Sequence, residues 1–199
     1  MCIRDREYEN LRAELALVKF GPAGDMTFQS MPSIELLGLT LRCVGGGGAP
    51  IPRQRLAVLH HKLKTDEVST MTLLGAQAVK DGQSLVLSRE IVAVTGRRDI
   101  GLKPRASSMP LKAEAQIWDG RFMVSSNAQN LRVQANYGVS LPRSKELTAS
   151  LSKLHKSVRP TCSVIIQDGT AFAVHEIEAA KVISLIKPRL EAALSQNTR

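Results

Sequence analysis

The chain has 199 residues, of which 43% are hydrophobic, and this composition is sufficient for a buried core and excludes a wholly disordered chain. Its 27 Lys and Arg residues outnumber 18 Asp and Glu residues, which gives a formal net charge of +9. Such an excess favours a polyanionic partner, with nucleic acid ahead of an anionic membrane surface. Aromatic residues make up only 4% of the chain, so recognition of RNA by shape and phosphates fits better than a row of base-stacking side chains.

The cysteines and the apolar runs indicate a cytoplasmic protein. Cys2, Cys43 and Cys162 are odd in number and far apart, which argues against a disulfide framework and for a reducing compartment. No apolar stretch approaches the roughly 20 residues that a membrane span requires, so no membrane association is expected. The opening residues 1–6 lack the apolar segment of a secretory signal.

Three amphipathic helices are predicted in the first 65 residues. The first runs from about Asp5 to Val18, and the second begins after Ser30 and Pro32, a cap and first-turn pair, and ends at the glycines of residues 45–48. The third begins near Pro52 and carries the highest density of cationic residues of the three. Its apolar side chains recur at helical spacing and are expected to face inward: Leu56, Leu59 and Leu63.

Beyond residue 66 the pattern changes to short extended segments joined by Asp-Gly pairs. Asp-Gly favours tight hairpin turns because glycine accepts a positive φ freely and aspartate tolerates it. Three hairpins are therefore predicted, at Asp81-Gly82, Asp119-Gly120 and Asp168-Gly169, the first of them between strands 72–79 and 84–87. Residues 131–136 alternate between apolar and polar, as a half-buried strand does.

The fold class expected is α+β, with a small helical subdomain followed by an antiparallel, hairpin-rich β domain. The predicted division places residues 1–65 in the helical subdomain and residues 66–199 in the β-rich domain. A short helix is expected from Ser144 to Lys156, and a C-terminal helix from Ile177 to Leu194, kinked or broken at Pro188.

No catalytic or metal-binding pattern stands out from the residues alone. The glycines of residues 45–48 lack the Gly-Lys-Ser/Thr of a phosphate loop and are interpreted as a helix end. Cys43 has no recognised metal spacing to His60 and His61. Cys162 and His175 could meet across a hairpin as a nucleophile pair, but an ordinary buried cysteine is the simpler interpretation. Trp118 is expected to anchor a core beside the second Asp-Gly turn.

The basic residues are the candidate RNA-binding site, with a solvated charged surface as the alternative. They gather on the third helix and in one loop rich in Arg, Lys, Pro and Ser. An unpaired buried cation is costly, so the four residues on the helix should be largely exposed. The candidates are Arg53, Arg55, Lys62 and Lys64 on the helix, and Arg97, Arg98, Lys103 and Arg105 in the loop.

Five short strings follow one another within roughly residues 11 to 125. They are Arg42-Cys43-Val44-Gly45-Gly46, Pro50-Ile51-Pro52-Arg53, Thr72-Leu73-Leu74-Gly75-Ala76, Ser88-Arg89-Glu90 and Trp118-Asp119-Gly120-Arg121-Phe122. In order and spacing they resemble the Arg-x-Val-Gly-Gly, Pro-Pro-Arg, Thr-Leu-Gly-Gly-Cys, Arg-Glu and Trp-Asp-Gly-Arg-Phe passages of the tRNA(Ile)-lysidine synthetases of the alphaproteobacterial type. Ile51, Leu74 and Ala76 depart from the family pattern, and residues 126–199 match only loosely.

The resemblance implies a function as the tRNA-binding C-terminal part of an ATP-dependent C–N ligase. That family joins lysine to the wobble cytidine of an isoleucine tRNA, with ATP and Mg²⁺ bound by an N-terminal ATP-pyrophosphatase domain. Because the Ser-Gly-Gly-x-Asp-Ser motif of that domain is absent from this sequence, no catalytic residue is assigned, no metal or cofactor is expected here, and the chain alone is expected to be inactive. A basic RNA-binding or protein-interaction module without enzymatic activity is the alternative.

Overall fold

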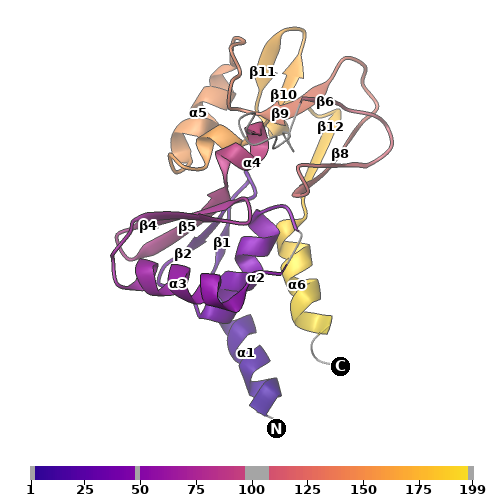
Figure 1. Cartoon of the computed structure of the whole chain (residues 1–199). Helices are drawn as coiled ribbons and strands as arrows, with labels where there is room; N and C mark the ends of the chain where they lie inside the picture. Colours follow the sequence, from indigo (N-terminus) through magenta and orange to yellow (C-terminus); the bar gives the residue numbers. More distant parts are fainter. Residues whose placement is uncertain (1–2, 48–49, 97–107, 197–199) are drawn as a thin grey trace.

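The computed structural model describes residues 3–47, 50–96 and 108–196, which form two lobes, one above the other in Figure 1. The lower lobe contains a five-stranded antiparallel sheet in the order β1-β2-β5-β4-β3 together with helices α1, α2, α3 and α6. Its elements are α1 (Ile3–Ala16), β1 (Lys19–Phe20), β2 (Met26–Phe28), α2 (Ile34–Val44), α3 (Arg53–Lys64), β3 (Thr70–Leu73), β4 (Ala76–Asp81), β5 (Ser84–Arg89) and α6 (Ile186–Gln196).

Helix α2 is the centre of the lower lobe. It contacts helices α1, α3 and α6 and strands β4 and β5, and these elements bury its apolar side chains. Leu36, Leu37 and Leu41 are fully buried there. Gly38 brings α3 close, because a Cβ at this position would lie 2.8 Å from the Leu56 side chain. The helices of both chain ends are thus held by one buried helix.

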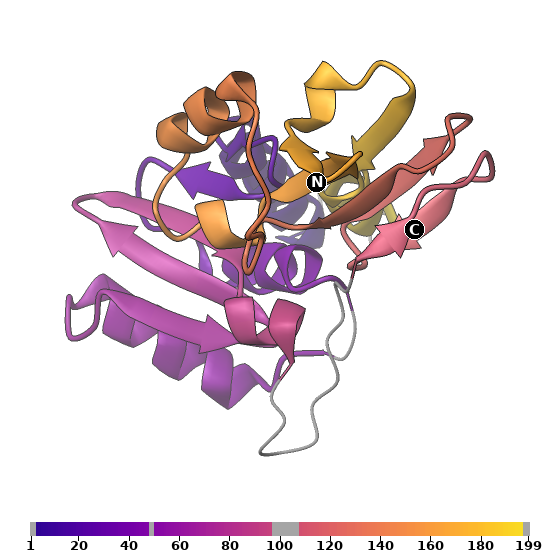
Figure 2. The same ribbon diagram turned by 90° about the horizontal axis from the view of Figure 1, so that it is seen from above.

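The upper lobe has two small antiparallel sheets that enclose a second core around Trp118 and Phe122. The four-stranded sheet has the order β11-β10-β9-β6, and the three-stranded sheet has the order β12-β8-β7. In Figure 2, α5 (orange) and the β7–β8 hairpin (salmon) lie on opposite sides of this lobe. The elements are α4 (Ile91–Thr95), β6 (Met109–Pro110), β7 (Gln116–Trp118), β8 (Phe122–Ser126), β9 (Arg132–Ala135), α5 (Lys145–Lys153), η2 (Arg159–Thr161), β10 (Ser163–Gln167), β11 (Thr170–Phe172), η3 (Val174–Glu176) and β12 (Ala180–Ser184).

The α+β fold class predicted from the sequence is confirmed, and all three Asp-Gly pairs join hairpin strands. The five-stranded sheet takes strands from both sides of residue 65, because β2 pairs with β5. The last helix of the chain also packs on α2 in the lower lobe. The predicted division into domains at residue 65 stays a prediction. Hydrogen bonds of the five-stranded sheet connect residues before and after this position.

Three predicted elements differ from the structure. The cap of the second helix is Ser33, whose hydroxyl accepts from Leu36 N, and not Ser30. The strand predicted over 72–79 is two strands joined by a turn at Leu74-Gly75, which the sequence hides because leucine seldom takes the positive φ of 51° found there. The segment 180–184 is strand β12 paired with β8, and Pro188 causes no kink because it lies in the first turn of α6, where no backbone N–H is needed.

An ion cluster joins the two lobes. Asp119, in the β7–β8 turn of the upper lobe, accepts from Arg89 Nε at 3.1 Å with one carboxylate oxygen and from Arg121 Nε at 2.6 Å with the other. Arg89 is the last residue of β5 in the lower lobe. The three side chains are no more than 1% exposed. We call Arg89, Asp119 and Arg121 the junction triad.

Three further nitrogens of the two guanidinium groups donate to backbone carbonyl oxygens, whereas Arg89 Nη2 has, among the described residues, only the ion-pair contact with Asp119 Oδ1 at 2.9 Å. Arg89 Nη1 donates to the carbonyl oxygens of Gly45 and Gly75 in the lower lobe. Arg121 donates through Nη1 to Ala23 at 2.9 Å and through Nη2 to Thr161 at 3.0 Å. Burial lowers the pKa of Arg121, and the Asp119 carboxylate opposes that shift. Buried charges are tolerated only when they are paired and hydrogen-bonded in this way.

Glycines allow the two backbones to meet beside the triad. Gly46, just after α2, has a φ of 86°, and Gly120 in the β7–β8 turn has a φ of 67°. A Cβ on Gly120 would lie 2.3 Å from the Gly46 carbonyl oxygen, and a Cβ on Gly46 would lie 2.8 Å from the Asp119 carbonyl oxygen. Both positions therefore need glycine for conformation and for space.

Replacing Asp119 with Asn should destabilise the protein strongly. The change keeps the size of the side chain and its tolerance of the φ of 52°, but it leaves two buried guanidinium groups without this counter-charge. Loss of one partner from a buried ion pair costs about 3–5 kcal/mol. Urea denaturation should show this loss in the free energy of unfolding.

Asp168→Asn is the matched control, because Asp168 is exposed and, like Asp119, precedes a glycine in a hairpin turn and has a positive φ, here 45°. Its free energy of unfolding should change by less than about 0.5 kcal/mol. Equal stabilities for the two variants would show that the junction triad does not hold the lobes together.

Candidate nucleic-acid interface

The cationic residues of α3 are presented to solvent. Arg53, Arg55 and Lys64 are exposed and Lys62 is half-buried, whereas Leu59 and Leu63 on the same helix are buried in the core of the lower lobe. Among the described residues, no carboxylate lies within ion-pair distance of these four cations. The charge of α3 is therefore free to meet an external anion.

Helical geometry separates these four residues into two pairs. Arg55 and Lys62 are seven positions apart, about two turns, and lie along one edge of the buried stripe. Arg53 and Lys64 are eleven positions apart, about three turns, and lie along the other edge. An extended polyanion that binds along one side of α3 would therefore contact either Arg55 and Lys62 or Arg53 and Lys64, but not all four residues.

The second predicted group lies outside the described residues. Arg97, Arg98, Lys103 and Arg105 all fall in 97–107, so their placement as RNA-binding residues stays a prediction.

The structure brings together a further group in the upper lobe that sequence reasoning missed. Arg143 Nε donates to Asn136 Oδ1 at 3.3 Å, and Asn136 Nδ2 donates to the carbonyl oxygen of Arg159 at 3.1 Å. Tyr137, next to Asn136, is 56% exposed. No sequence signal links these residues, because the pairing of β9 with β10 is what brings residues 136 and 159 together.

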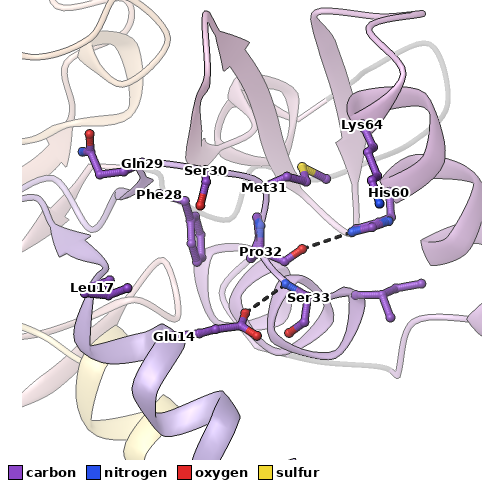
Figure 3. A pocket seen from close by; sticks show the side chains of 11 residues that line it. Glu14, Leu17, Phe28, Gln29, Ser30, Met31, Pro32, Ser33, His60 and Lys64 are labelled. Atoms are coloured by element: carbon purple, nitrogen blue, oxygen red, sulfur yellow. Dashed lines mark hydrogen bonds between the residues drawn. The ribbon is translucent and has the colours of Figure 1, made fainter.

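A cavity of about 380 Å³ lies between α1, the start of α2 and α3, and Figure 3 shows its lining side chains. Its polar groups hold the helix ends in place. Glu14 accepts from Ser33 N at 2.9 Å, at the cap of α2, and His60 Nε2 lies 3.1 Å from the carbonyl oxygen of Pro32, to which it must donate. Both groups thus have a structural role at the start of α2, and Lys64 adds positive charge to the lining of the cavity.

The cysteines of the described chain are free thiols without a metal cluster or an activating base. No group of three His, Cys, Asp or Glu residues among the described residues is arranged to hold a metal ion. Burial raises the pKa of the Cys162 thiol to about 11, Arg121 opposes this shift, and Asp25 adds to it. Cys162 is therefore protonated at neutral pH and unsuited to nucleophilic attack. Its residue is half-buried and packs against the small core of Ala23, Val86 and Val158.

Trp118 is only 2% exposed and lies against Phe122, with ring centroids 5.8 Å apart. The prediction that it anchors a core beside the second Asp-Gly turn is confirmed. Its burial also removes it as a base-stacking platform. In the described part of the chain, no helix has the length and apolar character needed to cross a bilayer.

Comparison with known proteins gives one clear similarity. The chain is 31% identical over 169 residues to the tRNA(Ile)-lysidine synthase of Caulobacter vibrioides (strain ATCC 19089 / CIP 103742 / CB 15). The match covers 79% of this chain. The resemblance to the tRNA(Ile)-lysidine synthases is confirmed. The chain spans about 39% of the length of this relative. No protein-family model matches the chain, and no solved structure matches it.

Four of the five strings that carry the lysidine synthase resemblance meet at the junction of the lobes. Gly45, Gly75, Arg89 and the Asp119–Arg121 segment come from four of these strings, and the hydrogen bonds of the junction triad connect them. These residues are buried or half-buried, and their hydrogen bonds connect the two lobes. The exposed cations lie apart from them.

The raised pKa of Cys162 makes stability depend on pH in the alkaline range. The unfolded thiol loses its proton near its ordinary pKa of 9.0, while the folded thiol keeps it to about pH 11. The unfolded state is thus favoured as pH rises through this window. Between pH 9 and pH 11 the wild type should lose roughly 2 kcal/mol of unfolding free energy relative to Cys162→Ala.

The measurement is urea denaturation of both proteins at several pH values, in which the other titrating groups cancel. Parallel stability curves for the wild type and Cys162→Ala would contradict the assigned burial of the thiol. Cys43→Ala tests selectivity, because the Cys43 thiol is half-buried and its pKa is also raised by burial but opposed by Arg189 and Arg42.

Proposed function

We propose that this chain is the tRNA-binding part of a tRNA(Ile)-lysidine synthase, which holds the tRNA by phosphate contacts. The similarity to the Caulobacter enzyme over 169 residues carries this proposal. Its name states isoleucine tRNA as the RNA and lysidine as the product. The net charge of +9 and the exposed cations of α3 support a polyanionic ligand.

In the complete enzyme, lysine would be joined to the wobble cytidine of isoleucine tRNA at the expense of ATP, with Mg²⁺ at the nucleotide. The sequence contains no Ser-Gly-Gly-x-Asp-Ser, so we assign the ATP and lysine sites to a domain outside this chain. This chain would then position the tRNA body relative to that domain, in the cytoplasm, where tRNA is modified. Phosphate contacts set position and register, and base recognition would lie largely in the catalytic domain.

The cations of α3 should contribute to tRNA binding as phosphate contacts. Replacing Arg53 and Lys64, the pair along one edge of α3, with Gln should weaken binding of an isoleucine tRNA transcript. The slope of log K against log salt should fall by roughly 0.7 to 0.9 for each lost contact, about equally for other tRNAs. Filter binding over a salt series gives both quantities.

The matched control is Lys112→Gln with Lys181→Gln, which removes the same charge from exposed positions of the upper lobe. It should leave a slope closer to that of the wild type. Equal effects of the two double variants would mean that only net charge matters and that α3 is a solvated surface. A tRNA affinity that does not change with salt concentration would argue against phosphate contacts by α3 and would favour a protein-interaction module instead.

A further inference from the structure

Tyr137 is the one exposed aromatic side chain among the described residues. It is 56% exposed, whereas Trp118, Phe28 and Phe122 are buried and the other described aromatic residues are half-buried. Nothing lies within 4 Å of a Cβ placed on Gly138, so the space beside Tyr137 is open. Its ring is therefore available for stacking on a ligand, which no other described Phe, Tyr or Trp side chain offers to the same extent.

The backbone around Tyr137 is fixed. Its N–H donates to the carbonyl oxygen of Pro160 at 2.8 Å, and the N–H of Asn136 donates to that of Cys162 at 2.8 Å. Val139 N donates to the carbonyl oxygen of Asn136 at 3.3 Å, which closes the turn. The ring is thus presented on a preformed support, so binding orders little additional backbone.

Two arginines are hydrogen-bonded to Asn136, the residue before the tyrosine, Arg143 through its side chain and Arg159 through its backbone carbonyl, and the side chains of both arginines are also held. Arg159 donates through Nε to Leu154 at 3.0 Å and through Nη2 to Ser152 at 3.1 Å, both carbonyl oxygens. Arg143 donates through Nε to Asn136 and through Nη2 to the Val139 carbonyl oxygen at 3.2 Å. Both arginines are exposed and retain further N–H donors.

No carboxylate pairs with either arginine among the described residues. The nearby Glu176 carboxylate accepts from the Ser144 hydroxyl at 2.7 Å and from the Ala173 N–H, so it is engaged within the fold. Two exposed arginines bonded to the residue next to an exposed ring match an anionic ligand that also carries a flat apolar face.

We propose that the Tyr137 face, formed by Asn136, Tyr137, Arg143 and Arg159, binds one unpaired nucleotide of the RNA. The tyrosine ring stacks on the base, and the two guanidinium groups contact the flanking phosphates. A single stacking residue suits an unpaired nucleotide attached to a folded RNA body. In tRNA this nucleotide comes from a loop or from the single-stranded 3′ end. The proposal rests on the proposed tRNA-binding function and adds a second contact, in the upper lobe.

The test uses the whole chain and fluorescence anisotropy with an isoleucine tRNA transcript, a blunt RNA duplex, the same tRNA without its unpaired 3′ end, and the isolated anticodon stem-loop. Tyr137→Ala should weaken tRNA binding about 5- to 100-fold and duplex binding less than about twofold. Tyr137→Phe should keep the wild-type affinity. Ile117→Ala, which removes an apolar side chain that is also 56% exposed in the same lobe, should change nothing.

The trimmed tRNA and the stem-loop identify the source of the nucleotide. The effect of Tyr137→Ala disappears with the trimmed tRNA if the 3′ end is bound, and it persists on the stem-loop if the anticodon loop is bound. Wild-type affinity of Tyr137→Ala for tRNA overturns this proposal alone and leaves the face as a protein contact. Failure of the wild-type chain to bind tRNA overturns the proposed function as well.

Discussion

Asp119 places one carboxylate between two buried arginines, and the connection between the lobes depends on it. Arg89 brings the end of β5 to this carboxylate, and Arg121 connects it to the loop before β2 and to η2. Asp25, only 9% exposed, adds a second acidic group that interacts electrostatically with Arg121. Burial raises the pKa of Asp25, and the positive charge of Arg121 opposes that shift. Two arginines, Arg89 and Arg121, and two aspartates, Asp25 and Asp119, are therefore buried in this region.

This junction connects the two lobes that carry the cationic surfaces. The α3 residues lie on the lower lobe, and the Tyr137 face lies on the upper lobe. A ligand that contacts both must span the junction, as a folded RNA of tRNA size would. In the complex that we propose, several weak phosphate contacts would act together with one stacking contact.

The sequence predicted those features that depend on local residue choice. Asp119-Gly120 and Asp168-Gly169 take the positive φ that their residue types allow, and Leu59 and Leu63 turn the cations of α3 outward. Features that depend on contacts distant in sequence were missed. The Leu74-Gly75 turn was missed because leucine seldom takes a positive φ. Strand β12 was predicted as the start of a helix because its extended conformation depends on pairing with β8, which is distant in sequence. The Tyr137 face joins residues more than twenty positions apart, and four of the five strings that resemble the lysidine synthases meet at the junction only in three dimensions.

Binding of tRNA by phosphate contacts is tested most directly by the equilibrium affinity of the wild-type chain for an isoleucine tRNA transcript. The affinity is measured over a range of salt concentrations, with polyglutamate as a competing polyanion. Log K should fall linearly with log salt, with a slope that corresponds to several phosphate contacts, and polyglutamate should displace little of the tRNA. A polyanion without the shape or bases of RNA should compete only through its charge. Absence of tRNA binding at low salt, or equal affinity for polyglutamate, would contradict the proposed tRNA binding.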